Sequence, residues 1–195
     1  MKHAIKQQIK NPVKGSIRII AGKYRGRKLP VLMSEGLRPT TDRVKETVFN
    51  WLMPYVQDAK CLDCFAGSGS LGFEALSRGA KQVTLLELNK SAASQLKANK
   101  LLLKAEEVKI NQTNTVEYLK GNIEKYDLVF LDPPFRKKLA EQCAILLNSG
   151  WLAEKSLIYV EMEANDNAQQ LPNNWCLLKE KIAGQVSYQL YQYQP

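Results

Sequence analysis

Two short stretches of the sequence contain residues whose types and spacing could do chemistry: GSGSLG at 67–72 and DPPF at 132–135. In the first, glycines allow the backbone to approach a ligand closely and to turn sharply into a helix, whose N-terminal amides then face that ligand. Glu87 ends a later apolar run, and a carboxylate there can accept hydrogen bonds from both hydroxyls of a ribose. This pattern predicts a nucleotide-containing cofactor, and both NAD and S-adenosylmethionine satisfy it.

The DPPF stretch follows the apolar run at 126–131. Pro133 fixes its own φ and has no N–H, and each proline pushes the residue before it toward extended geometry. A stiff loop of this kind can aim the Asp132 carboxylate and the Pro133 carbonyl at one small target with two N–H groups, while the Phe135 ring offers a stacking face. An exocyclic amine on a planar base fits this description, although the motif alone is also compatible with a turn that has Phe135 in the core.

Three features favour S-adenosylmethionine over NAD as the cofactor. The chain has 195 residues, about half of what a dinucleotide domain with two mononucleotide halves and a substrate domain would need. Asp63 lies four residues before Gly67, where its carboxylate can take up the ammonium end of a methionine moiety. The third feature is the DPPF stretch, which suits methyl transfer to an amine.

The elements that would position these residues are predicted by an alternation of apolar runs with helical patterns. Because strands and helices in this order form a doubly wound parallel sheet, we expect an α/β fold whose ligand lies beyond the carboxyl ends of the strands. The sequence predicts strands at 61–66, 83–87, 107–111, 127–131 and 157–161, and helices at 70–78, 90–104, 114–121 and 136–148. Two further β-rich runs, 175–182 and 186–193, should form an antiparallel pair at one sheet edge.

The N-terminal part departs from this alternation. Within it, a hairpin should join 17–21 to 24–29, and Thr40 or Thr41 should cap a helix that Pro54 ends. We therefore expect a disordered basic tail at 1–15, an extension made of the hairpin and helix at 16–55, and the catalytic domain at 56–195.

The net charge is concentrated at the N-terminus. Residues 1–30 contain nine Lys and Arg and no acidic residue, whereas residues 31–195 contain nineteen of each sign, so the first segment accounts for the whole net charge of +9. Such an asymmetry indicates contact with a polyanion, most often nucleic acid, although a solubilising tail would have the same composition. The basic residues expected to hold a nucleic-acid backbone are Arg25, Arg27, Lys28, Arg38, Arg43 and Arg136.

The cysteines predict neither disulfides nor a metal site. Cys61 and Cys64 form a C-x-x-C, but positions three apart on a strand point to opposite faces, and the only histidine is His3 in the tail. The sequence contains no apolar run of about 18 residues and no secretory signal, so we expect a cytoplasmic protein that neither binds a metal nor enters a membrane. A monomer is the default expectation for its assembly.

At these motifs the sequence resembles the class I S-adenosylmethionine-dependent methyltransferases, in particular the amino-methylating group with the motif (N/D/S)-P-P-(Y/F/W). From Ile17 to Tyr191 it resembles the bacterial 16S ribosomal RNA methyltransferases that act on N2 of guanine 966. The stretches that carry this resemblance are IRIIAGKYRGRKL, LRPTTDRVKETVFNWL, CLDCFAGSGSLGFEALSRGA, FLDPPF and AGQVSYQLY.

The resemblance implies a seven-stranded Rossmann-like sheet with its last strand antiparallel, S-adenosylmethionine as methyl donor, and 16S ribosomal RNA in the small ribosomal subunit as substrate. It implies that Asp132, Pro133 and Phe135 act on the amine. The residues that it implies in donor binding are Asp63, Phe65, Gly67, Ser68, Gly69, Glu87, Leu88, Asn114 and Asp132. The sequence departs from the family at Asn114, where many members have an Asp that binds the adenine amine; the amide oxygen of Asn can accept the same hydrogen bond.

Other interpretations of the sequence stay open at this point. The DPPF stretch would equally suit N6 of adenine in RNA or DNA, or a glutamine amide in a protein. A non-catalytic RNA-binding or assembly protein could keep the same fold. An NAD-dependent oxidoreductase is disfavoured by the short chain.

Overall fold

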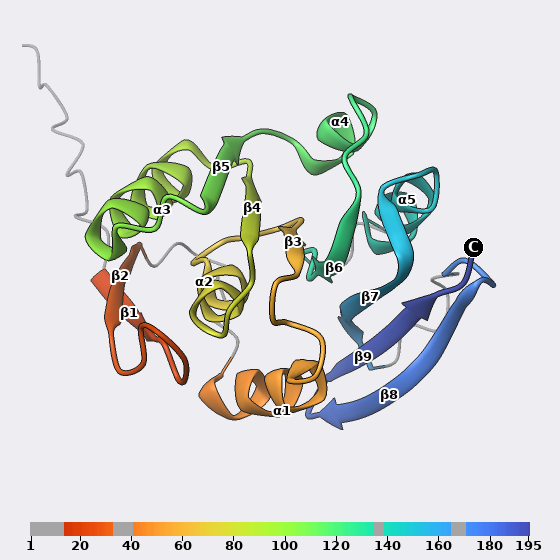
Figure 1. Cartoon of the computed structure of the whole chain (residues 1–195), viewed down its shortest axis with the longest axis horizontal. Helices are drawn as coiled ribbons and strands as arrows, with labels where there is room; N and C mark the ends of the chain where they lie inside the picture. The colour runs from red at the N-terminus through yellow and green to blue at the C-terminus, as the bar shows by residue number, and fades with distance from the viewer. Residues whose placement is uncertain (1–13, 33–40, 135–138, 165–170) are drawn as a thin grey trace, which may run out of the picture.

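The computed structural model describes residues 14–32, 41–134, 139–164 and 171–195. These residues form a two-stranded sheet, a seven-stranded sheet and five helices (Figure 1). The strands are β1 (Lys14–Arg18), β2 (Lys28–Leu32), β3 (Lys60–Asp63), β4 (Gln82–Glu87), β5 (Val108–Gln112), β6 (Tyr126–Leu131), β7 (Leu152–Glu163), β8 (Trp175–Ala183) and β9 (Val186–Tyr193). The helices are α1 (Asp42–Leu52), α2 (Ser70–Ser77), α3 (Lys90–Leu103), α4 (Thr115–Leu119) and α5 (Leu139–Leu147). None of the helices in this described part has the length and apolar character that crossing a membrane would require.

The large sheet has the strand order β5-β4-β3-β6-β7-β9-β8. Strands β3 to β7 run parallel, and β9 is antiparallel to both of its neighbours, β7 and β8. This confirms the predicted doubly wound α/β fold with an antiparallel last strand, and the predicted pairing of the two C-terminal runs. The chain goes from β3 outward to β4 and β5 and then returns to β6 on the other side of β3. The crevice between β3 and β6 is therefore the topological switch point at which such sheets bind ligands.

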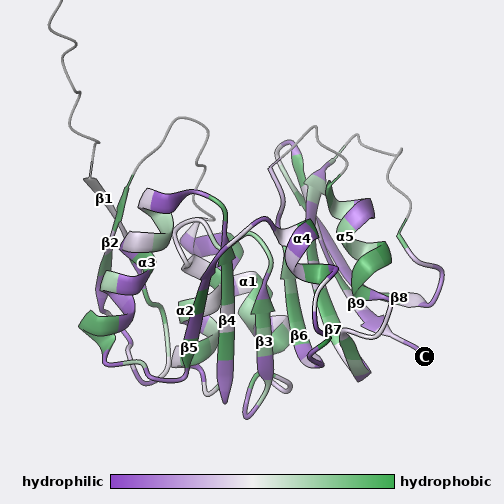
Figure 2. Cartoon of the chain, turned by 90° about the horizontal axis from the view of Figure 1, so that it is seen from above, coloured by the Kyte–Doolittle hydropathy of each residue, from purple (hydrophilic) through white to green (hydrophobic). Residues whose placement is uncertain are grey.

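Apolar residues alternate between the two faces of the sheet, and helices cover both faces. Cys61 and Phe130 pack with residues of α1, α2 and α3 in one buried cluster. Leu62 and Val129 pack with residues of α4 and α5 in a second cluster. Figure 2 shows the apolar character of the central strands β3, β6 and β7 between these layers. Because Cys64 belongs to the second cluster and Cys61 to the first, the prediction that these cysteines face opposite sides is confirmed.

Most predicted elements are present, with ends that differ by a few residues. β3 ends at Asp63, and the segment that follows it stays bonded to the neighbouring strands: Cys64 donates to the Phe130 carbonyl of β6 (3.0 Å) and Ala66 to the Leu86 carbonyl of β4 (2.9 Å). β7 extends at both ends beyond the predicted 157–161, and α4 is shorter than the predicted 114–121. In the helix predicted at 136–148, α5 begins at Leu139, and 136–138 lie outside the described residues.

The N-terminal hairpin exists, but its strands do not have the predicted bounds. β1 pairs with β2, and residues 19–27 connect them instead of forming strand ends. The reason lies in α2, whose Glu74 carboxylate accepts hydrogen bonds from the backbone N–H groups of Ile20 (2.8 Å) and Ala21 (3.1 Å). Those N–H groups are therefore used by the helix and do not enter a β-ladder.

The extension shares its core with the rest of the molecule. Ile17 of β1, Leu29 of β2 and Phe49 of α1 are buried in the same cluster as Phe130 of β6. The Thr41 hydroxyl caps α1 by accepting the N–H of Val44 (3.4 Å), as one of the two predicted caps. Of the predicted tail, 1–13 lie outside the described residues, and 14 and 15 already belong to β1. The division between extension and catalytic domain at 55/56 stays a prediction.

Candidate active site

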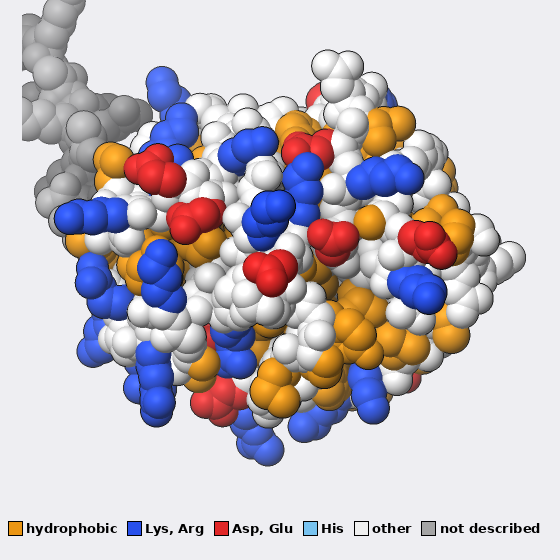
Figure 3. Space-filling view, viewed as in Figure 1, with side chains coloured by type: hydrophobic (Ala, Val, Ile, Leu, Met, Phe, Trp, Pro, Cys, Tyr) orange, Lys and Arg blue, Asp and Glu red, His pale blue; other side chains and the backbone are white. Residues whose placement is uncertain are grey.

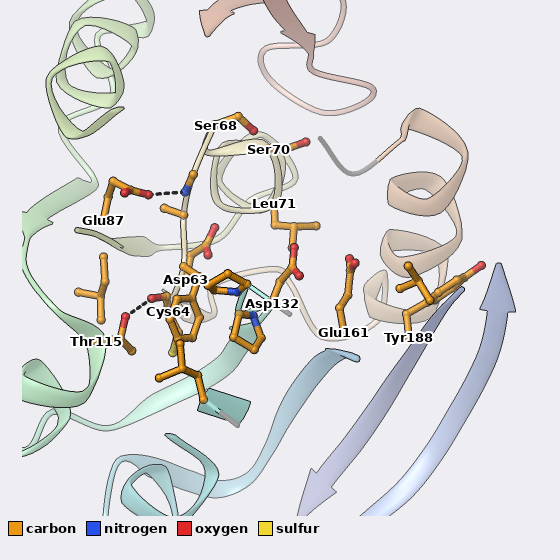
Figure 4. A pocket seen from close by; sticks show the side chains of 18 of the residues that line it. Asp63, Cys64, Ser68, Ser70, Leu71, Glu87, Thr115, Asp132, Glu161 and Tyr188 are labelled. Atoms are coloured by element: carbon orange, nitrogen blue, oxygen red, sulfur yellow. Dashed lines mark hydrogen bonds between the residues drawn. The ribbon is translucent and has the colours of Figure 1, made fainter. Parts of the chain in front are cut away.

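A cleft of about 1490 Å³ lies at the carboxyl ends of the parallel strands. It is lined by the residues that end or follow β3, β4, β6 and β7, by the glycine loop, by the start of α4 and by the β8–β9 turn at 183–186. Figure 4 shows the side chains of the central strands converging on this space. The cleft thus occupies the switch point, and it brings the glycine-rich stretch and the DPPF stretch together as expected from their places after β3 and β6.

The glycine loop is held by the strand beside it. The Gly67 N–H donates to Oε2 of Glu87, the last residue of β4, over 2.9 Å (Figure 4). Gly69 has φ +78, and a Cβ there would lie 2.6 Å from the Phe73 ring and 2.7 Å from a methyl of Leu96. Gly69 does not line the cleft in the described structure, so its observed role is to let the loop pack against α2 and α3.

Asp63 is a buried carboxyl group at the end of β3, only 2% exposed, that lines the cleft. Burial raises its pKa to about 7, the backbone N–H groups of Phe65 and Gly72 lower it, and the Glu87 carboxylate raises it. Gly72, whose N–H bonds this group, leaves room for the Leu85 side chain, which a Cβ there would meet at 2.3 Å. A cation placed beside Asp63 would favour its ionised form. A carboxyl group that binds an ammonium has to ionise when the cation is present.

Three carboxyl groups form a row across neighbouring strands. Asp132 follows Phe130 by two residues and Glu161 follows Tyr159 by two, so both lie on the sheet face that carries Asp63. Figure 4 shows the three side chains at the same edge, with Asp132 between the others. Burial raises the pKa of Asp132 well above its ordinary value, and the nearby Glu161 and Asp63 raise it further.

The cleft is acidic although the protein is basic. Its described lining contains five acidic residues and no Lys or Arg; the acids are Asp63, Glu87, Asp132, Glu161 and Glu163. No three His, Cys, Asp or Glu side chains in the described part of the chain are placed to hold a metal ion. S-adenosylmethionine carries a sulfonium, an ammonium and ribose hydroxyls, which suit a wall of carboxylates, and its one carboxylate leaves it with a net positive charge. The two phosphates of NAD would meet like charge, so the residues present fit the methyl donor and not the dinucleotide.

The other predicted site residues are distributed as follows. Phe65, Ser68, Leu88 and Pro133 line the cleft, and Leu88 is 65% exposed there, which leaves an apolar surface beside Glu87. Phe135 lies outside the described residues.

Asn114 lines the cleft, but its amide oxygen is already engaged. Oδ1 accepts the N–H groups of Val116 (2.9 Å) and Glu117 (3.3 Å) and so caps α4. An amide oxygen has two acceptor lone pairs, and the cap uses both. The expectation that this oxygen also accepts the adenine amine stays a prediction, and the amide NH₂ offers a donor beside it.

Several residues that line the cleft were not singled out from the sequence. Glu161 could have been found, because it ends the predicted strand at 157–161 and the ends of parallel strands share one edge. The β8–β9 turn and Tyr188 could not, since they reach the cleft only because β9 inserts between β7 and β8.

Three of the basic residues predicted to hold nucleic acid, Arg25, Arg27 and Lys28, lie away from the cleft. Arg25 and Arg27 are exposed in the β1–β2 connection, Lys28 starts β2, and the Arg27 guanidinium donates to the Leu102 carbonyl of α3 (3.2 Å). The connection is bound to the C-terminal end of α2, where the Lys23 N–H donates to the carbonyl of helix residue 77 (2.7 Å). The cleft is at the N-terminal end of that helix, whose 8 residues rise about 12 Å.

Other basic residues have different positions. Arg43 is exposed in the first turn of α1, next to Thr41 and Val44, which line the cleft. Arg38 and Arg136 lie outside the described residues. On the face in Figure 3, Lys and Arg side chains are most frequent on the left, over β1, β2 and α3 of Figure 1.

Comparisons with known proteins agree with this geometry. Residues 17–192 match the family model described as conserved hypothetical protein 95. The chain is 57% identical over 192 residues to ribosomal RNA small subunit methyltransferase D of Haemophilus influenzae, covering 95% of this chain and 99% of that protein. It is 53% identical over 179 residues to the protein of the same name from Escherichia coli K12, covering 91% and 90% of the two chains. A solved Escherichia coli structure provisionally described as a methyltransferase superposes with a TM-score of 0.87 at 50% identity, covering 92% of this chain and 99% of that one. The chain therefore belongs to the conserved hypothetical protein 95 family, is a relative of ribosomal RNA small subunit methyltransferase D, and has the fold of class I methyltransferases.

Proposed function

We propose that this protein transfers a methyl group from S-adenosylmethionine to the exocyclic N2 amine of a guanine, guanine 966, in 16S ribosomal RNA of the small ribosomal subunit. The two relatives named above are called ribosomal RNA small subunit methyltransferase D, and this chain matches nearly the whole length of each. The sequence resemblance supplies the finer statement, the base and the position.

The observation that carries the proposal is the acidic cleft at the switch point. Its described lining has five carboxyl groups and no basic residue, in a chain with a net charge of +9. Asp63 would hold the ammonium end of the donor and Glu87 its ribose hydroxyls, while the exposed side of Leu88 would contact the adenine. The donor supplies an electrophilic methyl group. A phosphate-bearing cofactor or an RNA phosphate would be repelled from the same walls.

At the other end of the cleft, Asp132 and Pro133 would receive the acceptor amine. The lone pair of a guanine amine is delocalised into the ring, which makes the amine a weak nucleophile. Hydrogen bonds from its two N–H groups to the Asp132 carboxylate and the Pro133 carbonyl would favour the pyramidal form and direct the lone pair toward the donor. Correct positioning then supplies most of the acceleration, and the amine loses its proton readily once it is methylated.

The base must leave its stack to reach this buried position. Extrusion costs a few kcal/mol, and stacking of a base on an aromatic ring returns about 1–3 kcal/mol. We assign the stacking role to Phe135. Backbone contacts are assigned to Arg25, Arg27, Lys28 and Arg43, with Arg38 and Arg136. Because the first three lie near the far end of α2, an RNA that used them would have to extend along the side of the domain. We also propose that the protein acts as a monomer.

The test is methyl transfer with labelled donor to small subunits stripped of this modification, compared with free 16S ribosomal RNA, followed by mapping. We expect N2-methylguanosine at one position. N6-methyladenosine in the digest would show that the acceptor is wrong. Absence of transfer to any RNA, with donor binding intact, would favour a non-catalytic binding protein instead.

A further inference from the structure

Glu161 places a second carboxylate beside Asp132 at the acceptor end of the cleft. It belongs to β7, the strand next to β6, and it is 8% exposed and lines the cleft. β7 lies between β6 and β9: Glu161 is paired with Tyr188 of β9, and the pairing with β6 ends one residue earlier, at Val160. Neighbouring strands are about 4.8 Å apart, so two carboxylates here can receive two adjacent donors of one small ring.

The direction of this carboxylate is fixed by Tyr159, two residues earlier on the same strand. The Tyr159 hydroxyl donates to Oε1 of Glu161 over 2.6 Å. Tyr159 is fully buried, and burial raises the pKa of its hydroxyl well above the ordinary value, so it stays a donor. A hydrogen bond of this kind limits rotation of the Glu161 side chain. Figure 4 shows Glu161 directed into the same space as Asp132.

The two purines differ at the atom next to the amine. In guanine, the N2 amine is adjacent to N1–H, a second donor. In adenine, the N6 amine is adjacent to N1 with a lone pair, an acceptor. If Asp132 takes the amine of either base, a carboxylate one strand further attracts N1–H of guanine and repels N1 of adenine. A glutamine amide presents a carbonyl oxygen beside its NH₂ and is repelled in the same way.

We propose that Glu161 accepts the N1–H of the acceptor base and thereby makes the enzyme specific for guanine over adenine. This inference rests on the proposed function and adds a specificity-determining residue to it. Enzymes that act on extruded bases read them by hydrogen bonds to the Watson–Crick edge, and Glu161 and Asp132 supply two acceptors for one edge.

The experiment compares guanine with 2-aminopurine at the mapped acceptor position in reconstituted small subunits. 2-Aminopurine keeps the 2-amine but has an unprotonated N1. The wild-type protein should transfer methyl to guanine about 10- to 100-fold faster than to 2-aminopurine, the scale of one charged hydrogen bond. In Glu161→Gln, the amide can accept from N1–H or donate to N1, so the ratio should fall to about 1, mainly through loss of guanine methylation. Any effect of the missing 6-oxygen is common to both proteins and cancels when their ratios are compared.

The matched control is Glu154→Gln, the same change on β7 at an exposed position near the start of the strand. It should keep the wild-type ratio. Binding of S-adenosylhomocysteine checks that each variant is folded. The inference is overturned if Glu161→Gln keeps the wild-type ratio. It is also overturned if the wild-type protein methylates guanine and 2-aminopurine equally, a result that needs no variant. Wild-type protein that binds the donor product but methylates no guanine would instead refute the proposed function.

Discussion

The acidic cleft and the basic β1–β2 connection lie at opposite ends of one helix, α2. At its N-terminal end, Ser70 and Leu71 line a cleft with five carboxyl groups. At its C-terminal end, the Lys23 N–H donates to a helix carbonyl beside a connection that carries Arg25 and Arg27. The carboxylates of the first region attract a cationic donor and repel phosphates, whereas the arginines of the second attract phosphates. The comparison suggests two uses of charge. The net charge of the chain indicates a polyanionic partner, whereas the charge of the cleft lining indicates which cofactor the cleft can hold.

The two regions are also built differently. The cleft collects residues from the ends of several strands that are far apart in sequence. The basic connection is one continuous segment, held against α2 by Glu74, whose carboxylate accepts the N–H groups of Ile20 and Ala21 and the Arg78 guanidinium (2.7 Å). Lys45 of α1 also reaches Glu74, at 3.8 Å. Its Nζ also donates to the hydroxyl of Ser70 (3.3 Å), which lines the cleft, so Lys45 links the two regions.

Removing the Asp132 carboxylate should impair methyl transfer at the acceptor end of the cleft. Asp132→Ala takes away the carboxylate that orients the amine, so transfer should fall by at least about 100- to 1000-fold, as when one preorganised polar group is lost from an active site. Binding of S-adenosylhomocysteine, measured by calorimetry, should change little, because Asp63 and Glu87 remain. Glu154→Ala, a carboxylate removed from an exposed site, serves as control. Normal transfer by Asp132→Ala would refute the assigned role.

Removing Glu74 should detach the basic connection. Glu74 is fully buried, so Glu74→Ala leaves Lys45 buried with fewer partners and leaves two backbone N–H groups unsatisfied. Breaking such a buried ion pair lowers the free energy of unfolding by about 3–5 kcal/mol, which urea denaturation would measure. The exposed pair Glu117–Lys120 gives a control, since Glu117→Ala should cost less than about 0.5 kcal/mol. Equal stability of the two variants would contradict this account.

Neutralising the connection should separate RNA affinity from catalysis. Replacing Arg25, Arg27 and Lys28 by Gln should make the negative slope of log K against log salt shallower by about 2, because each phosphate contact contributes about −0.7 on single strands. Substitution is preferable to deletion, since Ile19 and Leu29 of the same segment are core residues. Three exposed lysines elsewhere give a control with the same change of charge: Lys109, Lys120 and Lys125. Equal slopes for both triple variants would mean that the segment only solubilises the protein.

Donor binding should depend on pH through Asp63. Its pKa is raised to about 7, so the folded protein without donor holds a proton there that the unfolded chain releases near pH 4. Stability without donor should therefore decrease as pH rises between these values. The donor's ammonium favours the ionised form, so affinity for S-adenosylhomocysteine should be roughly tenfold weaker at pH 6 than at pH 8. Asp63→Asn should flatten this dependence in calorimetric titrations, while Asp132→Asn tests the contribution of the neighbouring group. Equal slopes for wild type and Asp63→Asn would exclude Asp63.

The cleft was more predictable from sequence than the basic surface. Asp132 follows one predicted strand and Asp63 lies inside another, and the carboxyl ends of parallel strands meet at one edge whatever their separation along the chain. The path of the N-terminal segment has no such rule. It depends on close packing with α2, where a Cβ on Gly22 would lie 1.7 Å from the Ser77 carbonyl oxygen. Such a contact leaves no periodic pattern in the sequence.

Asn114 is a second residue whose role could not be fully predicted from the sequence. Its position at the end of the third parallel strand was predicted, but the use of its oxygen as the cap of α4 depends on where that helix begins. A residue that can either cap a helix or bind a ligand is assigned only when the local backbone is known.

By itself, the sequence determined the order of strands and helices, the place of the glycine loop and of Asp132 at the carboxyl edge, and the excess of positive charge at the N-terminus. Only the tertiary structure decided that β7 lies next to β6 and so brings Glu161 beside Asp132, that the β8–β9 turn lines the cleft, and that Arg25 and Arg27 lie at the far end of α2. The physical reason is that periodicity and strand direction are local properties of the chain. Packing between distant segments decides which strands are neighbours and which loop a buried carboxylate holds.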